Sequence, residues 1–230
     1  MEQRSIALDG PAGAGKSTLA RMAAKHYGII YVDTGALYRC VGLYVYKNNV
    51  SPKDLPGVAQ LLPGIKIEME YDGSGVQRMF LNGEDVTDEI RIPYISGYAS
   101  DVSAMQPVRD FLLFMQQDMA VKYDVIMDGR DIGTVVLPGA GLKVFLTAAL
   151  ETRAKRRYLE LMDKKINADY QEVLRDMETR DRNDSERAAA PLKPAEDSVI
   201  LDTTHLALDE SFTALCGLID ERLSINEPKL

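Results

Sequence analysis

The chain has 230 residues, and its 27 Lys+Arg against 35 Asp+Glu give a formal net charge of −8. This acidic balance disfavours broad binding to nucleic acids or anionic membranes by whole-surface attraction. With 46% hydrophobic and 27% charged residues, the composition is that of a globular protein that can bury a core. The length suits one large domain with an insertion better than two equal domains.

Cysteine content and the absence of targeting signals indicate the compartment. Cys40 and Cys216 are the two cysteines of the sequence, too few for a disulfide framework or a four-ligand zinc site. The N-terminus lacks the apolar stretch of a signal peptide, and no run approaches the roughly 18 apolar residues of a membrane span. We therefore expect a cytoplasmic protein, a monomer, with neither nucleic acid nor membrane as a partner.

Five short apolar runs are typical of buried strands, and each ends at or near Gly, Asp or Thr. They cover residues 5–8, 29–32, 124–127, 142–146 and 198–201. Segments with helical spacing lie between most of these runs or follow the last one, at residues 17–27, 107–122, 150–164, 170–184 and 208–224. This alternation indicates an α/β fold with a parallel sheet covered by helices on both faces.

One stretch breaks the alternation. Residues 65–71 alternate strictly between apolar and polar side chains, then turn at Asp-Gly-Ser-Gly (72–75) and continue into a second run, 76–81, that ends at Asn82-Gly83. This pattern predicts a small antiparallel β meander with one exposed face. Because it lies between the second and third parallel strands, we interpret residues 60–98, approximately, as an inserted subdomain.

The first apolar run leads directly into a segment that fits G-x-x-x-x-G-K-[ST], with a strand before it and a helix after it. The segment consists of Gly10, Pro11, Ala12, Gly13, Ala14, Gly15, Lys16, Ser17 and Thr18. Small residues let the backbone wrap a phosphate, and the N–H groups and the helix N-terminus supply partial positive charge. Lys16 would reach the β- and γ-phosphates, and Ser17 offers a ligand to Mg²⁺. The segment predicts binding of a nucleoside triphosphate.

A loop of this kind is compatible with a GTPase switch, a motor-type ATPase or a small-molecule kinase. No Asn-Lys-x-Asp segment that reads guanine occurs in the sequence, which disfavours a GTPase. The third apolar run ends at Asp128, which is placed to hold a metal ion through its water shell. Gly129 follows, where an ATPase that activates water would usually have Glu. The pattern favours a phosphoryl acceptor other than water.

Two arginines follow strand ends where open α/β sheets bind ligands. Arg39 comes after the second apolar run and Arg130 after the third. A guanidinium group can bind a phosphate through two parallel hydrogen bonds. Either arginine alone would also suit an ordinary surface, but two arginines facing one crevice favour a binding site.

More arginines lie on the later predicted helices. Arg153, Arg156 and Arg157 share one helical face, and Arg180, Asp184 and Arg187 line one side of the next helix. Residues 150–187 hold 10 Lys/Arg and 10 Asp/Glu, so a solvated, salt-bridged helical pair is one interpretation. The other is a lid that closes over a triphosphate, excludes water and supplies arginines.

Four motifs together resemble the bacterial type of cytidylate kinase, within the nucleoside monophosphate kinases, over essentially the whole chain. They are Asp-Gly-Pro-Ala-Gly-Ala-Gly-Lys (9–16), Asp-Thr-Gly-Ala-Leu-Tyr-Arg (33–39), Asp-Gly-Arg-Asp-Ile-Gly-Thr-Val-Val (128–136) and the segment from Arg-Asp (180–181) to Ala-Pro-Leu (190–192). The resemblance implies the P-loop kinase fold, with a five-stranded parallel sheet in the order 2-3-1-4-5, a β insert and a short helical lid. It divides the single domain 1–230 into a core (1–33, 123–149 and 190–230), an acceptor-nucleotide part (34–122) and a lid (about 150–189).

The resemblance also implies Mg²⁺-dependent transfer of the ATP γ-phosphoryl group to CMP, and to dCMP. The implied catalytic residues are Lys16, Arg130, Arg153 and Arg157, and the implied Mg²⁺ ligands are Ser17 and Asp128. Three arginines are implied to hold the acceptor phosphate: Arg39, Arg130 and Arg187. Ser100, Arg109 and Asp131 are implied to read cytosine. Arg180 and Asp184 are implied to face the ribose. Thr34 is placed in the CMP site, and Tyr38 would pack either on the acceptor nucleotide or in the core.

The base-reading assignment is chemically reasonable. Cytosine presents an exocyclic amine beside two acceptors, which a carboxylate paired with an arginine complements, whereas the uracil carbonyl would meet Asp131 badly. Two alternatives remain open at this point. One is a P-loop kinase for UMP, AMP or a non-nucleotide metabolite, and the other is an ATP-dependent switch or binding module that signals through the β insert.

Overall fold

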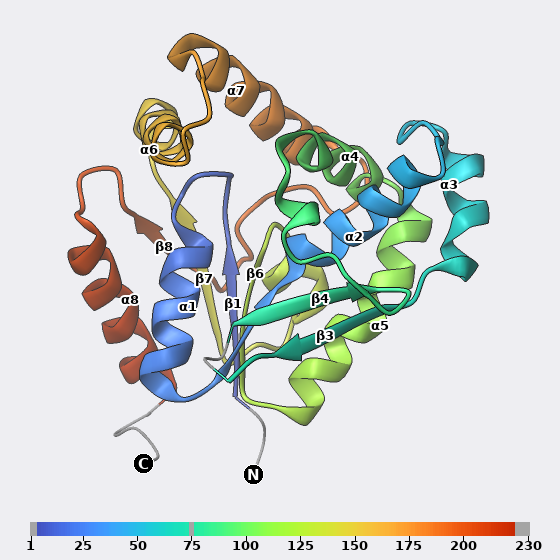
Figure 1. The fold of residues 1–230 in the computed structure, drawn as a ribbon. Coiled ribbons are helices and arrows are strands. Elements are labelled where there is room, and N and C mark those ends of the chain that lie inside the picture. Colours follow the sequence, from blue (N-terminus) through green and yellow to red (C-terminus); the bar gives the residue numbers. More distant parts are fainter. Residues whose placement is uncertain (1–3, 74–75, 224–230) are drawn as a thin grey trace.

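The computed structural model describes residues 4–73 and 76–223 (Figure 1). Within these residues, five parallel strands form one sheet in the order β2-β6-β1-β7-β8. The strands are β1 (Ser5–Asp9), β2 (Ile30–Asp33), β6 (Val125–Gly129), β7 (Leu142–Thr147) and β8 (Val199–Asp202). This confirms the predicted order 2-3-1-4-5, and it places β1, which precedes the glycine-rich loop, at the centre of the sheet.

Helices cover both faces of the sheet (Figure 1). The five predicted helices correspond to α1 (Lys16–Tyr27), α5 (Gln106–Lys122), α6 (Leu150–Asp163), α7 (Tyr170–Glu186) and α8 (Leu208–Leu223). α1 and α8 pack on one face, where Leu19 and Leu215 join Ile6 and Val144 in a buried cluster. α5 covers the opposite face, and α6 and α7 form a hairpin beyond the carboxyl ends of the strands. The predicted final helical residue, Ser224, lies outside the described part of the chain.

Three helices were not predicted: α2 (Thr34–Lys47), α3 (Leu55–Leu61) and α4 (Pro93–Ser103). α2 begins directly after β2, where the Asp33 side chain accepts a hydrogen bond from the N–H of Ala36 at 3.0 Å and caps the helix. Buried residues surround much of α2, which packs against both α4 and α5. Short helical turns η1 (Leu62–Gly64), η2 (Glu89–Arg91) and the π-helical η3 (Ile132–Val136) complete the described helices, none of which is long and apolar enough to cross a membrane.

The predicted meander is confirmed as an antiparallel sheet of β3 (Ile67–Tyr71), β4 (Gln77–Leu81) and β5 (Glu84–Asp85). Its inward residues, such as Ile67 and Met79, are buried, while Glu68 and Glu70 are exposed. Residues 74 and 75 of the predicted turn lie outside the described residues. α4 begins at Pro93, inside the range predicted for the insert, and packs against α2.

The meander covers the open edge of β2, which is an end strand of the parallel sheet. Tyr71 Oη donates to the carbonyl oxygen of Tyr31 at 2.9 Å, and the N–H of Asp33 donates to Gln77 Oε1 at 2.9 Å. An uncovered edge would present these backbone groups to other chains. The insert therefore closes this edge and holds the strand end from which α2 starts.

Gln77→Leu is expected to lower the free energy of unfolding by about 1–3 kcal/mol, because the buried N–H of Asp33 would lose its acceptor. Urea denaturation followed by circular dichroism measures this change. Glu70→Gln, an exposed position of the same meander, is the control and should stay within about 0.5 kcal/mol of the unmodified chain. Equal stability of the two variants would contradict a bracing role for Gln77.

The prediction that the fifth apolar run is buried was wrong. Side chains of β8 alternate between half-buried and exposed, and Ile200 is 54% exposed. β8 pairs only with β7 among the described strands, so it forms the second end of the sheet. Leu201 packs against the α1–α8 side, whereas Ile200, the adjacent residue of the strand, points to the other face and is exposed.

Candidate active site

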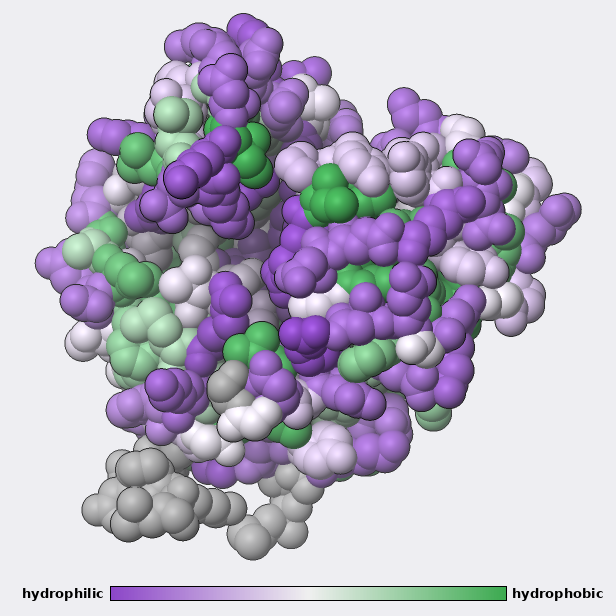
Figure 2. Space-filling view, viewed as in Figure 1, coloured by the Kyte–Doolittle hydropathy of each residue, from purple (hydrophilic) through white to green (hydrophobic). Residues whose placement is uncertain are grey.

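A cleft of about 1330 Å³ opens at the carboxyl ends of β1, β2 and β6. Figure 2 shows the molecule hollowed between the side that carries α6 and α7 and the side that carries α2 and α4, with mainly hydrophilic residues around the opening. Predicted site residues from all four motifs line this cleft. They are Ala12–Thr18, Thr34, Tyr38, Arg39, Ser100, Arg109, Asp128, Arg130, Asp131, Arg157, Arg180, Asp184 and Arg187.

The glycine-rich loop between β1 and α1 depends on two close approaches. Gly10 has φ +146°, and a Cβ there would overlap the carbonyl oxygen of Leu146 in β7. Gly13 has φ +73°, and a Cβ there would lie 2.8 Å from Cε of Met177 in α7. These positions need glycine both for the left-handed backbone and for space. The loop is thus held tightly between the sheet and the α6–α7 hairpin.

Lys16, the first residue of α1, is buried below the cleft and donates from Nζ to the carbonyl oxygen of Pro11 at 2.8 Å. Burial lowers the pKa of Lys16 well below its usual value, and the neighbouring Arg130 charge lowers it further. Both effects disfavour a lone ammonium group. An anion bound in the cleft would counter both.

Ser17 and Asp128 bring two oxygen atoms together on the floor of the cleft. Ser17 Oγ donates to Asp128 Oδ2 at 2.6 Å, and Tyr31 Oη donates to Oδ1 at 3.0 Å. Burial raises the pKa of Asp128, and the nearby Asp33 carboxylate adds to this. Mg²⁺ is typically held by one or two protein oxygens together with waters and substrate phosphates, which this pair fits. Among the described residues no group of three His, Cys, Asp or Glu is placed to hold a metal ion.

Two buried acid–arginine groups lie on the opposite side of the cleft. Asp131 pairs with Arg109, and Arg187 Nη2 lies 3.5 Å from Asp131 Oδ1. Asp184 accepts a hydrogen bond from Arg130 Nε at 2.7 Å. Burial raises the pKa of Asp131, whereas at Asp184 the Arg130 and Arg180 charges outweigh burial and lower the pKa. Each carboxylate is therefore held in place by guanidinium groups from other elements.

Arg180 extends the positive cluster. Burial, followed by the charge of Arg130, lowers its pKa to about 10. Its Nε has no hydrogen-bond partner among the residues that the structure describes. An arginine that is buried, repelled by a like charge and short of an acceptor is a strong binding position for an anion.

The predicted arginine face of α6 is divided between two locations. Arg153 is buried behind the glycine-rich loop, where Nε donates to Ala148 O at 2.8 Å and Nη1 donates to Ala12 O at 3.1 Å. Its Nη2 lies 2.7 Å from Asp181 Oδ2 of α7. Arg157 instead lines the cleft, paired with Glu160 at 2.9 Å. Arg153 thus ties the loop to the α6–α7 hairpin.

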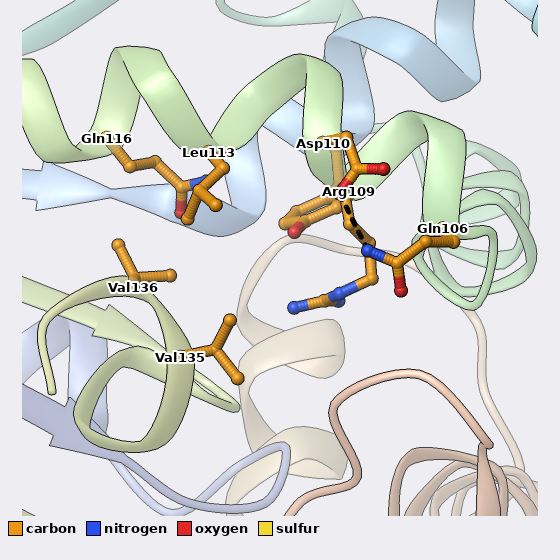
Figure 3. A pocket seen from close by; sticks show the side chains of 8 residues that line it. Gln106, Arg109, Asp110, Leu113, Gln116, Val135 and Val136 are labelled. Carbon is orange, nitrogen blue, oxygen red and sulfur yellow. Dashed lines mark hydrogen bonds between the residues drawn. The ribbon is translucent and has the colours of Figure 1, made fainter.

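The remaining predicted residues surround the Asp131 side of the cleft. Thr34 Oγ1 donates to the carbonyl oxygen of Asp128 at 2.7 Å, and Arg109 Cζ lies 5.7 Å from the centre of the Tyr38 ring. Figure 3 shows Arg109 extending from α5 toward the turn that carries Val135. A separate cavity of about 30 Å³ lies behind it, too small for a nucleotide. Tyr38 therefore serves to support Arg109 as well as to line the cleft.

Sequence reasoning assigned no role to several groups that the fold brings to this region: Asp9, Tyr31, Asp33 and Asp181. Asp9 Oδ1 and Oδ2 accept hydrogen bonds from the N–H groups of Ile132 and Gly133, each at 2.7 Å. Asp33 caps α2 and lies 3.8 Å from Arg91. Asp9 and Asp33 share one detectable signal, a carboxylate that ends a buried apolar strand.

The burial of Asp9 predicts a specific pH dependence of stability. Burial raises its pKa from 3.8 to about 6, so the folded state binds the Asp9 proton more tightly than the unfolded state. As pH rises from about 3, below the unfolded-state pKa, to about 7, above the folded-state pKa, stability should fall by roughly 3 kcal/mol relative to Asp9→Asn. Urea denaturation of both proteins across this range measures the difference. A difference that does not change with pH would show that Asp9 ionises normally.

Comparison with known proteins identifies the family of the chain that forms this cleft. The chain matches the family model described as Cytidylate kinase over residues 6–221. The chain belongs to the cytidylate kinase family. It is 51% identical over 210 residues to the cytidylate kinase of Caldicellulosiruptor bescii, with 91% of this chain and 92% of that protein covered. The cytidylate kinase of Lactobacillus johnsonii is 44% identical over 217 residues, covering 94% of each chain.

These findings confirm the resemblance drawn from the four motifs. Cytidylate kinases phosphorylate CMP with ATP, so the chain is a nucleotide-binding phosphotransferase of that kind, with ATP as the phosphoryl donor. The solved structure of a gluconokinase from Sinorhizobium meliloti matches the fold, with a TM-score of 0.50 and 14% identity over 97% of this chain and 96% of that one. At that identity the likeness concerns the α/β fold alone.

Proposed function

We propose that the chain transfers the γ-phosphoryl group of ATP to CMP and to dCMP, giving CDP or dCDP and ADP, with Mg²⁺ bound. The observation that carries this proposal is the cleft that joins the glycine-rich loop and Lys16 to the cluster of Arg130, Arg180 and Arg187. The loop side suits a triphosphate, and the arginine cluster suits a second phosphate opposite it. A cleft built only for ATP hydrolysis would need no second set of phosphate-binding groups.

On the donor side, Lys16 is proposed to leave Pro11 O and bind the β- and γ-phosphates, a contact that also relieves its unfavourable burial. Ser17 and Asp128 would hold Mg²⁺, which when bound neutralises negative charge on the phosphates. Tyr31 keeps the Asp128 carboxylate oriented toward this position.

On the acceptor side, Arg39, Arg130 and Arg187 are proposed to bind the phosphate of CMP, with Arg180 and Asp184 beside the ribose. A phosphate oxygen of CMP is already a nucleophile, so no covalent enzyme intermediate is needed. The contribution of the protein is then to place the two phosphates in line and to neutralise their charge.

Asp131 is proposed to accept a hydrogen bond from the cytosine amine, with Arg109 and Ser100 at the adjacent acceptors of the base. Arg109 and Arg187 hold the Asp131 carboxylate from two sides. Uracil carries a carbonyl oxygen where cytosine carries the amine. Two acceptors would then face each other in a buried site, which is costly and disfavours UMP.

We further propose that residues 34–122 form the acceptor-binding part and residues 150–189 a lid. Arg157 forms an exposed ion pair with Glu160. Such pairs are weak, so its guanidinium can turn toward the transferring phosphoryl group. Arg153 would act from its buried position by fixing the loop. We also propose that the protein is a monomer and cytoplasmic.

An assay of ADP release with CMP, dCMP, UMP and AMP as acceptors tests the proposed function. We expect kcat/KM for CMP to exceed that for UMP by about 10²-fold or more, because the wrong base leaves a buried acceptor unpaired. A preference for UMP would refute the base-reading assignment. Nucleotide-dependent partner binding without acceptor-stimulated ADP release would indicate a switch instead of a kinase.

A further inference from the structure

The Asp9 carboxylate is buried at the carboxyl end of β1, immediately before the glycine-rich loop, and is 4% exposed. Both of its oxygens accept hydrogen bonds from the main chain. Oδ1 binds the N–H of Ile132 and Oδ2 the N–H of Gly133, each at 2.7 Å. These are the first two residues of η3, which lies 123 and 124 positions away in the sequence.

Asp131 stands at the N-cap of η3, since its carbonyl oxygen accepts hydrogen bonds from Val135 at 2.9 Å and from Val136 at 3.2 Å. An aspartate in this position ordinarily turns its own carboxylate back onto the first free N–H groups of the helix. Within the described residues, Asp131 makes no such capping bond. Its carboxylate faces Arg109 and Arg187 instead.

We propose that Asp9 is a positioning residue for base recognition: it binds the N–H groups at the start of η3 and so leaves the Asp131 carboxylate free to read cytosine. The inference rests on the proposed function of Asp131. In this proposal Asp9, from the central strand, caps η3. Asp131, the N-cap residue that would ordinarily cap the helix, instead reads the base.

Close packing around Gly133 supports this division. A Cβ at Gly133 would lie 3.3 Å from Asp9 Oδ2 and 3.1 Å from Cδ of Lys143, so a side chain there would crowd the Asp9 carboxylate. Burial raises the pKa of Asp9, which means that keeping an ionised carboxylate here costs stability. Because Gly10 follows Asp9 directly, the same strand end places both the phosphate loop and the base-reading turn.

The first test is Asp9→Asn, with dissociation constants for CMP, UMP and ATP measured by isothermal titration calorimetry. The amide keeps the shape of the side chain but turns one acceptor into a donor that faces an N–H, so Asp131 should rotate to cap η3. We expect the dissociation constant for CMP to rise about tenfold and the preference for CMP over UMP to fall by a similar factor, with ATP binding within about twofold of the unmodified chain.

Asp197→Asn is the matched control, because Asp197 pairs with Lys143 on the other side of Gly133 at 2.8 Å. It removes a carboxylate from the same neighbourhood without touching η3 or Asp131, and CMP binding should not change. Equal weakening of CMP and ATP binding by Asp9→Asn, or the same loss of CMP binding in the control, would overturn the inference.

A double-mutant cycle with Asp131→Asn shows whether Asp9 acts through Asp131. We expect Asp131→Asn to reduce the preference for CMP, and Asp9→Asn to change that preference little further in its background. Additive effects, or an unchanged preference in Asp9→Asn alone, would overturn the inference and leave the base-reading proposal intact. If Asp131→Asn itself leaves the preference unchanged, the base-reading proposal fails, and this inference fails with it. The cycle is repeated with Asp9→Ser, which retains one acceptor, so that the test does not depend on one variant folding.

Discussion

Lys16→Ala is expected to lower kcat by about 10³-fold or more, because it removes the cation nearest the phosphates that the loop would bind. In the structure the Lys16 ammonium is buried and donates to the carbonyl oxygen of Pro11, so it is available to exchange this contact for a phosphate. The ADP-release assay at saturating ATP and CMP measures the loss. Wild-type-like turnover would refute the role of Lys16.

Two further variants separate the charge of Lys16 from its packing. Lys16→Met keeps the apolar stem and should lose as much activity as Lys16→Ala. Burial and the Arg130 charge both lower the pKa of Lys16, so the charged ammonium group destabilises the folded state. The melting temperature of Lys16→Met should therefore be no lower than that of the unmodified chain. Lys25→Met, at an exposed position of α1, is the control and should retain full turnover.

Arg130→Ala is expected to reduce kcat/KM for CMP by roughly 10³-fold, within the range found for arginines that stabilise a transferring phosphoryl group. Arg130 lies between the two halves of the cleft, since its charge lowers the pKa of both Lys16 and Arg180. Its Nε also holds Asp184 at 2.7 Å. Removing it would therefore weaken the phosphate site and release a carboxylate at the same time.

Arg130→Lys is the informative companion variant, because a lysine keeps the charge but cannot bind a phosphate through two parallel bonds while holding Asp184. We expect it to recover little of the activity. Arg182→Ala, at an exposed position of α7, is the matched control. Circular dichroism and thermal melting identify any loss due to unfolding, since Asp184 loses a buried partner in Arg130→Ala. Normal kcat/KM in a folded Arg130→Ala protein would refute the assignment.

The net charge of −8 is an average over unequal regions. The residues that line the cleft include ten Lys or Arg and nine Asp or Glu, a net of +1, so the excess negative charge of the chain lies outside the cleft. Burial strengthens the local field, because water screens these charges poorly. An acidic chain can therefore select small anions such as nucleotides while its outer surface repels long polyanions.

Much of the proposed donor site could be predicted from the sequence because its parts are neighbours along the chain. A strand, a glycine-rich loop and a helix N-terminus adjoin one another between residues 5 and 27, so the motif carries its own geometry. The strand order was also predictable once the family resemblance was recognised. The start of α2 was also marked in the sequence, because Asp33 at the end of β2 caps the helix.

The acceptor site depends on contacts that no local pattern encodes. Arg130 meets Asp184 across 54 positions, and Arg109 meets Asp131 across 22. The separation of Arg153 from Arg157 likewise follows from the packing of α6 on the loop, although the two residues lie on one helical face.

By itself, the sequence determined the phosphate loop, the parallel sheet, the meander and the family to which the chain belongs, because each is written in neighbouring residues or in a recognisable motif. Only the tertiary structure decided which groups each buried carboxylate contacts. The sequence does not distinguish the carboxylates of Asp9 and Asp131. In the structure, Asp9 caps η3, which begins 123 positions away, whereas Asp131 faces Arg109 and Arg187. That difference arises from the packing of β1 against η3, which brings distant backbone N–H groups to Asp9 and leaves the Asp131 carboxylate facing Arg109 and Arg187.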